Sequence, residues 1–188
     1  MTNVLLNISR EEFYEWLAAR HATESECWTE LHRGSTPPAN GALWYVDSVC
    51  VALCFGWIDS VNKRVDGVLM QRFTPRKAHS RWSELNKERC RYMERQGLMT
   101  AAGRAVMPDM SPHGFTIDAE ILTEFRRHRK AWRNFRSFPS LYQRVRIDTI
   151  QRDKSDMDVF HQRLARLIAA SHDGRMIGEW NDGGRLSC

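Results

Sequence analysis

The chain has 188 residues, a net charge of +5 and 42% hydrophobic residues, with seven Trp among them. This length and composition fit one domain, with or without a helical appendage, and exclude a wholly disordered chain. The longest apolar run, residues 49–55, is far shorter than the roughly 20 residues of a membrane-spanning helix, and the first residues do not resemble a secretory signal. Five Cys without a C-x-x-C pair indicate reduced thiols in a cytoplasmic protein.

Charge is distributed unevenly along the chain. Residues 1–59 contain eight acids and three bases, whereas residues 60–106 contain four acids and eleven bases. Residues 118–146 are again basic, with eight bases and three acids. A basic middle that folds over the acidic N-terminal part neutralises itself, whereas one left open attracts nucleic acid or other anions. Most of the bases are Arg, which suits planar pairing with carboxylate or phosphate and stacking on aromatic rings.

The first hundred residues predict a small sheet with helices around it. Ser9 and Glu12 have the spacing of a capping box at the start of a helix. Asp66 and Gly67 form a turn signal between two runs with strand character, which predicts a β-hairpin. The expected strands are residues 25–33, 57–65 and 68–74. The expected helices are residues 10–20, 42–54, 80–96 and 100–107, with Ser80 or Ser83 as the cap of the third.

Beyond a linker rich in Pro and Gly, the apolar spacing is helical throughout. We expect helices over residues 118–137, 139–152 and 156–172, with Ser155 or Asp156 as the cap of the last one. The predicted fold class is therefore α+β: a small antiparallel sheet of about three strands packed by helices, followed by a helical C-terminal portion. The predicted divisions are an α+β core at 1–107, a linker at 108–117, a helical portion at 118–174 and a loose tail at 175–188.

The sequence contains no motif that assigns an enzyme mechanism or a cofactor. Seven His form no metal-binding pair, and Cys50 and Cys54 are expected to be buried structural thiols, so no metal is predicted. Ser60 and Lys63 match S-x-x-K without its companion motifs. There is no phosphate-binding or dinucleotide-binding glycine loop. We therefore expect a binding protein rather than an enzyme, with no catalytic residue assigned.

Residues 128–146 interleave bases with aromatic residues. This composition is typical of a surface on which bases of single-stranded nucleic acid stack. The aromatic residues also recur at helical spacing, as a core face does, and the Arg residues then form a solvated face. Both interpretations remain open. The candidate nucleic-acid-binding residues are Arg126, Arg129, Lys130, Trp132, Arg133 and Arg136.

The most distinctive stretch is CFGWID at 54–59, followed by QRFTPRKAHSRW at 71–82. If the hairpin packs against the helix at 80–96, side chains from both strands and the helix converge between two Trp walls. Such a set can hold an anion or a planar ligand, or it can be a buried network of ion pairs that binds nothing. The candidate ligand-binding residues are Trp57, Asp59, Arg64, Gln71, Arg72, Arg76, Trp82, Asn86 and Arg89.

This region resembles the YdeI/OmpD-associated family of small bacterial proteins, which are sometimes labelled bacteriocin-protection proteins. The resemblance is carried by ALCFGWIDS (52–60), KRVD (63–66), QRFTPRKAHSRWSELNKER (71–89) and GLMTAAG (97–103), and more loosely by FPSLYQRVRIDTIQ (138–151). It implies a role in tolerance of antimicrobial peptides or in envelope stress. It carries over no catalytic residue.

Three functions follow as hypotheses. The first is a non-enzymatic stress-protection protein that recognises an anionic small molecule or a peptide carboxylate through Arg72, Arg76 and Arg89. The second is sequence-tolerant nucleic-acid binding by the positive region 60–146. The third is an enzyme in which Asp59 acts as a general base oriented by Arg64.

Overall fold

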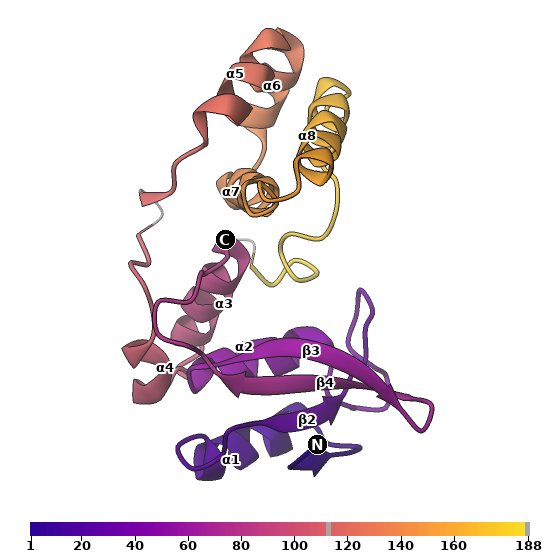
Figure 1. Cartoon of the computed structure of the whole chain (residues 1–188), viewed down its shortest axis with the longest axis vertical. Helices are drawn as coiled ribbons and strands as arrows, with labels where there is room; N and C mark the ends of the chain where they lie inside the picture. Colours follow the sequence, from indigo (N-terminus) through magenta and orange to yellow (C-terminus); the bar gives the residue numbers. More distant parts are fainter. Residues whose placement is uncertain (112–113, 187–188) are drawn as a thin grey trace. The chain divides into compact units, whose positions relative to one another are not determined.

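A computed structural model describes residues 1–111 and 114–186. The chain divides into two compact units (Figure 1). The first unit comprises Met1–Trp82 and Asn86–Pro108, and the second comprises Ser83–Leu85 and the chain from Asp109 onward. Among the described residues, no helix combines the length and the hydropathy needed to cross a lipid bilayer.

The first unit is built on a four-stranded mixed sheet, which confirms the α+β fold class. The strands lie in the order β1-β2-β4-β3, with β1 parallel to β2 and the other neighbours antiparallel. Asp66 and Gly67 both have positive φ, 47° and 83°, as the two-residue turn between β3 and β4 requires. The strands are β1 (Val4–Leu5), β2 (Cys27–Glu30), β3 (Trp57–Val65) and β4 (Val68–Pro75).

The expectation of about three antiparallel strands misses β1. This strand has two residues, too few for an alternating pattern, and it joins the sheet through backbone pairing of Val4 and Leu5 with β2. The side chain of Asn3 reinforces the pairing by donating a 3.0 Å hydrogen bond to the carbonyl of Glu26. Contacts between residues far apart in sequence define β1, so no local pattern reveals it.

Helices α1 and α2 cover one face of this sheet. Asp59 of β3 pairs with Phe73 of β4, so both side chains, together with Trp57, point to the same face. On that face the ring of Phe13 from α1 lies 5.3 Å from the ring of Phe73. The helices that accompany the sheet are α1 (Arg10–Arg20), α2 (Tyr45–Cys54), α3 (Glu84–Arg95) and α4 (Ala101–Ala105).

Helix α1 begins at the predicted capping box. The hydroxyl of Ser9 accepts a 3.1 Å hydrogen bond from the backbone N–H of Glu12, whose carboxylate accepts one of 2.7 Å from the backbone N–H of Ser9. Helix α2 begins at Tyr45, about one turn after the expected residue 42. Helix α3 begins at Glu84, directly after Ser83, the later of the two residues that were expected to cap it.

Helix α4 packs closely on the end of α2. The carbonyl oxygen of Cys54 accepts hydrogen bonds from the backbone N–H of Thr100, at 3.2 Å, and from its hydroxyl, at 2.5 Å. Gly103 lies directly over this carbonyl, because a Cβ built there would be 2.3 Å from the Cys54 oxygen. Only glycine fits this approach without a shift of backbone.

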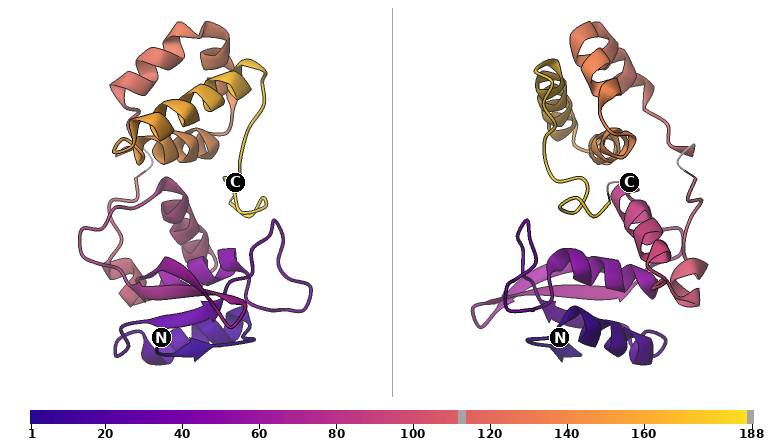
Figure 2. Two further views of the ribbon diagram at one scale, coloured as in Figure 1. Left: turned by 45° about the vertical axis from the view of Figure 1, so that its right-hand side comes forward. Right: turned by 180° about the vertical axis from the view of Figure 1, so that it is seen from behind.

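The second unit is a bundle of four helices with its own core. Its helices are α5 (Ala119–Arg127), α6 (Arg129–Ser137), α7 (Ser140–Gln151) and α8 (Met157–His172). Asp156 caps α8 through a 3.1 Å hydrogen bond from the backbone N–H of Val159. Figure 2 shows α8 beside α6 and α7 in two further views. The core between the helices is almost completely shielded from solvent, and its largest members are Phe125, Phe135, Tyr142 and Phe160.

The single helix expected over residues 118–137 is two helices. The backbone leaves the helical conformation at His128, where ψ is 71°. In a continuous helix Phe125 and Phe135 would lie about 15 Å apart along the axis. The break instead brings their rings into a stack with centroids 4.8 Å apart. Periodicity does not reveal this break, because the apolar residues fit one stripe in either arrangement.

The segment after α8, expected to be a loose tail, contacts α7. The backbone N–H of Ile177 donates a 3.0 Å hydrogen bond to the hydroxyl of Tyr142. The ring of Trp180 lies edge-on to that of Tyr142, with centroids 5.7 Å apart. Ile177 and Trp180 thus cover one side of the helical core.

Candidate functional site

The structure divides the residues that were expected to converge. Trp57 is 1% exposed, and its indole N–H donates a 3.2 Å hydrogen bond to the carbonyl of His21. Its ring packs edge-on against Trp16 of α1, with centroids 6.1 Å apart. Trp57 therefore belongs to the core between sheet and helix, and it forms no wall of an open site.

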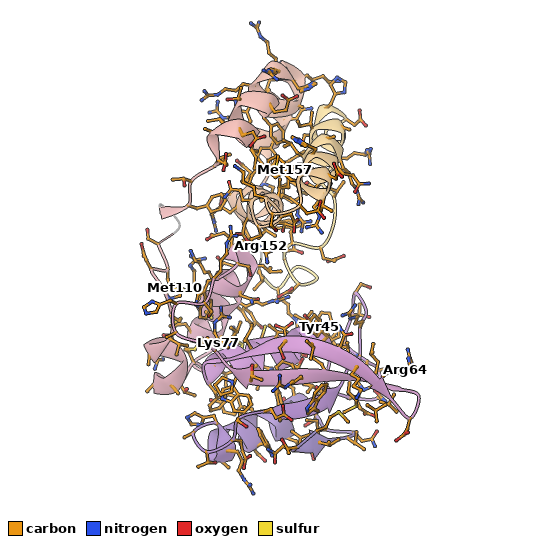
Figure 3. All side chains as sticks on the ribbon, in the orientation of Figure 1. Tyr45, Arg64, Lys77, Met110, Arg152 and Met157 are labelled. Carbon is orange, nitrogen blue, oxygen red and sulfur yellow. The ribbon has the colours of Figure 1, made fainter. Side chains whose placement is uncertain are left out.

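Three polar residues of the hairpin lie away from Asp59 or have other partners. Arg64 is exposed beside the hairpin turn, where it donates to the backbone carbonyl of Gly67, and Figure 3 shows it at the turn end of the hairpin. Arg72 points to the face of the sheet opposite to that of Phe73 and Asp59, and it pairs with Glu26 at 2.6 Å. Gln71 lies on the same face of the sheet as Asp59, but it is buried and donates to the backbone carbonyl of Val61 in β3. The predicted convergence is wrong for Arg64 and Arg72.

A smaller cluster does form, and its centre is Tyr45. The hydroxyl of this residue, at the start of α2, donates a 2.7 Å hydrogen bond to the carboxylate of Asp59. Burial and the charge of Asp59 raise the pKa of Tyr45, while the positive charges of Arg89 and Arg33 oppose that rise. Arg89 is 7% exposed and donates to Asn86 at 2.9 Å.

Tyr45 was not among the predicted site residues. It is 14 residues from Asp59 and is separated from it by a helix and a turn, so no spacing rule connects them. The available signal was chemical, since a partly buried Tyr hydroxyl normally finds a hydrogen-bond partner, and Asp59 is the acid of the neighbouring strand.

Arg76 and Trp82 form the second part of this cluster. The guanidinium of Arg76 lies 3.8 Å from the centroid of the Trp82 ring and donates a 2.9 Å hydrogen bond to the carbonyl of Arg81. Its buried Nε has no acceptor among the described residues. Burial lowers the pKa of Arg76, and the nearby carboxylate of Asp59 opposes that change. The predicted site residues that come together are thus Asp59, Arg76, Trp82, Asn86 and Arg89.

The thiols near this cluster are structural. Cys50, Cys54 and Cys90 are buried, and the thiol of Cys54 donates to the carbonyl of Cys50. Burial raises the pKa of Cys90 to about 12, so the nucleophilic thiolate is disfavoured. Within the residues that the structure describes, no group of His, Cys, Asp and Glu is arranged to hold a metal ion.

Residues 6–106 match a protein family described as a domain of unknown function, DUF8412. The chain belongs to this family. The DUF8412 match includes β2, β3, β4 and all of the cluster around Tyr45, but none of helices α5–α8. No curated protein and no solved structure matches the chain.

Outside the DUF8412 match, α5 and α6 carry a row of exposed bases. Trp132 is partly buried and packs against the helical core, and Phe135 is fully buried, so both contribute to that core. The role in nucleic-acid binding expected of Trp132 stays a prediction. Five bases are exposed, and none of them has an ion-pair partner among the described residues: Arg126, Arg129, Lys130, Arg133 and Arg136. We call these five residues the basic row.

Proposed function

We propose that the chain binds nucleic acid without sequence preference through the basic row of α5 and α6. The observation that carries this proposal is the absence of acidic partners for five exposed bases among the described residues. Neighbouring Arg127 differs, because it pairs with Glu124 at 2.8 Å. An unpaired Arg or Lys side chain can form a new charge-assisted hydrogen bond with a phosphate, whereas a paired one already has such a bond with its carboxylate.

The geometry favours contacts to the phosphate backbone. Arg129, Arg133 and Arg136 follow one side of α6 at intervals of four and three residues, over about 10 Å of helix. The aromatic residues between them face the core, so base stacking contributes nothing to this proposal. Binding through phosphates alone is tolerant of sequence and strongly dependent on salt.

The test is the salt dependence of binding to a labelled duplex of about 20 base pairs, measured by fluorescence anisotropy. If all five bases contact phosphates, the logarithm of the binding constant falls with the logarithm of salt concentration with a slope of about −4.5. Arg133→Gln should make that slope shallower by about one. Arg104→Gln removes the same charge from a residue paired with Glu94, so it is the matched control. Equal slopes for both variants, or no binding at low salt, would contradict the proposal.

The cluster in the DUF8412 region supports a second candidate, the binding of an anionic small molecule or peptide carboxylate. The specific observation is Arg76, whose stacked guanidinium has a buried Nε without an acceptor among the described residues. The stress-protection role implied by the YdeI/OmpD-associated resemblance belongs with this candidate. A thermal-shift series with acetate, succinate and benzoate tests it: Arg76→Gln should abolish any stabilisation, whereas the exposed Arg64→Gln should retain it.

The enzyme hypothesis required Arg64 to orient Asp59, and the contacts of Arg64 do not support that role. Asp59 is held by the hydroxyl of Tyr45, whereas Arg64 bonds to the carbonyl of Gly67 at the hairpin turn. A general base needs a partner that holds it toward substrate, and Arg64 does not serve Asp59 in this way.

A further inference from the structure

A small cavity in the helical unit is lined by both apolar and positively charged side chains. It has a volume of about 230 Å³ and lies between α7, α8 and the segment that follows α8. Apolar surface comes from Ile150, Leu167 and Ile177, and positive charge comes from Arg146, Arg163 and Arg166. This volume is below the roughly 300–1,000 Å³ of sites for drug-sized ligands, so the cavity suits a smaller molecule.

Arg146 is held in place at this cavity by α7 and by the segment after α8. Its Nη2 donates to the backbone carbonyl of Glu179, and its guanidinium lies 5.9 Å from the centroid of the Tyr142 ring. Gly178 permits the approach, because a Cβ at that position would lie 2.5 Å from Nη1 of Arg146. The buried Nε of Arg146 has no acceptor among the described residues. The Nε–H of Arg146 is therefore a positioned donor that a ligand could use.

The charges around the cavity are only partly balanced. Arg163 pairs with Asp153, and the carboxylate of Glu179 lies near enough to Arg146 to influence its pKa. Arg166 has no ion pair within the described part of the chain, and its charge acts unfavourably on Arg146. An anion between these two guanidinium groups would offset their mutual repulsion. It would also offset the free-energy cost of burying the positive charge of Arg146.

We propose that this cavity binds a small phosphate monoester with an apolar ester group. A phosphate dianion matches two guanidinium groups in charge, and each can pair with its oxygens in the planar geometry that Arg provides. The apolar ester group then lies against Ile150, Leu167 and Ile177. This site is separate from the basic row, which contributes none of the residues that line the cavity.

Calorimetric titration of the full chain with phenyl phosphate tests the proposal. We expect saturable binding at one site, weaker binding of inorganic phosphate, and a loss of about tenfold in affinity for phenyl phosphate in Arg166→Gln. Arg166 is exposed, so its replacement leaves the core intact. Arg133→Gln, a change in the basic row, should leave phenyl phosphate binding unchanged.

Three results would overturn the proposal. They are an absence of saturable binding, equal affinity of Arg166→Gln and the unaltered chain, and equal affinity for benzoate and phenyl phosphate. The nucleic-acid proposal fails separately, since it depends on the response of duplex binding to Arg133→Gln.

Discussion

The hydroxyl of Tyr45 and the carboxylate of Asp59 form the best-defined polar contact of the cluster in the DUF8412 region, at 2.7 Å. Tyr45→Phe removes the donor and leaves Asp59 without this partner. Hydrogen bonds to charged groups contribute about 1.5–3 kcal/mol, so the free energy of unfolding in urea should fall by about that amount.

Tyr14→Phe provides the comparison for this change. The hydroxyl of Tyr14 donates a 2.9 Å hydrogen bond to the carbonyl of Leu98, a neutral acceptor. Its loss should reduce the free energy of unfolding by about 1 kcal/mol. A loss for Tyr45→Phe no larger than this would argue against a charge-assisted bond to Asp59.

Glu26 should make the first unit sensitive to acid. The backbone N–H of Thr2 and the indole N–H of Trp28, with Arg72, donate to its carboxylate and lower its pKa from 4.5 to about 2. Because the folded-state pKa is lowered, this stabilisation is complete above the unfolded value of 4.5 and is lost as the pH falls toward 2. Thermal melts between about pH 2 and 6 should show a flatter dependence for Glu26→Gln than for the unaltered chain. Glu15→Gln, at an exposed position of α1, should keep the original dependence.

The sequence predicted some residues of the cluster correctly but also included residues that lie elsewhere. The sequence placed Asp59, Arg76, Trp82, Asn86 and Arg89 in one site, and the structure brings these five together. Arg72 was grouped with them, yet the alternation of β4 turns it to the other face, where an acid of the segment before β2 is its partner. Trp57 was expected to form a wall, yet α1 buries it. Such choices depend on what covers each face, which local sequence does not state.

At the scale of elements, a substitution that adds one methyl group can test the close packing of α4 on the end of α2. Gly103→Ala places a Cβ 2.3 Å from the carbonyl oxygen of Cys54 and 2.6 Å from the sulfur of Met99, and the backbone of Cys54 leaves little room to move. Overpacking of this kind costs about 1–3 kcal/mol, which chemical denaturation can measure. Gly34→Ala is the control, because the nearest atom to its Cβ would be 3.4 Å away. Equal losses of stability in the two variants would contradict this account of the packing.

Elements with local signals were predictable and those made by distant contacts were not. The capping box of α1 and the turn between β3 and β4 involve neighbouring residues, so their chemistry is visible in the sequence. Strand β1 depends on its pairing with β2. The break at His128 depends on the stacking of the Phe125 ring on the ring of Phe135. Local periodicity is compatible with either outcome in both places.

For the whole molecule, the segment between α4 and α5 should be the preferred site of limited proteolysis. Its Phe115 lies outside helices and strands and is only partly buried against the helical core. Brief digestion with chymotrypsin should cut first after Phe115, because backbone outside helices and strands enters a protease more easily than packed helix does. Phe13, Phe73 and Phe125 are fully buried and should resist. Mass spectrometry of the fragments identifies the cut, and an early cut at any of these three would contradict the prediction.

The contacts of Ile177 and Glu179 with α7 have a consequence for the timing of synthesis. A growing chain that has reached His172 possesses the residues of all four helices of the second unit, including the entire basic row. It lacks the carbonyl that holds Arg146 and the glycine that admits its guanidinium. Since folding can begin while the ribosome is still working, the proposed nucleic-acid surface would be complete before the proposed phosphate site. Truncation after His172 would remove part of the proposed phosphate site and keep every residue of the basic row.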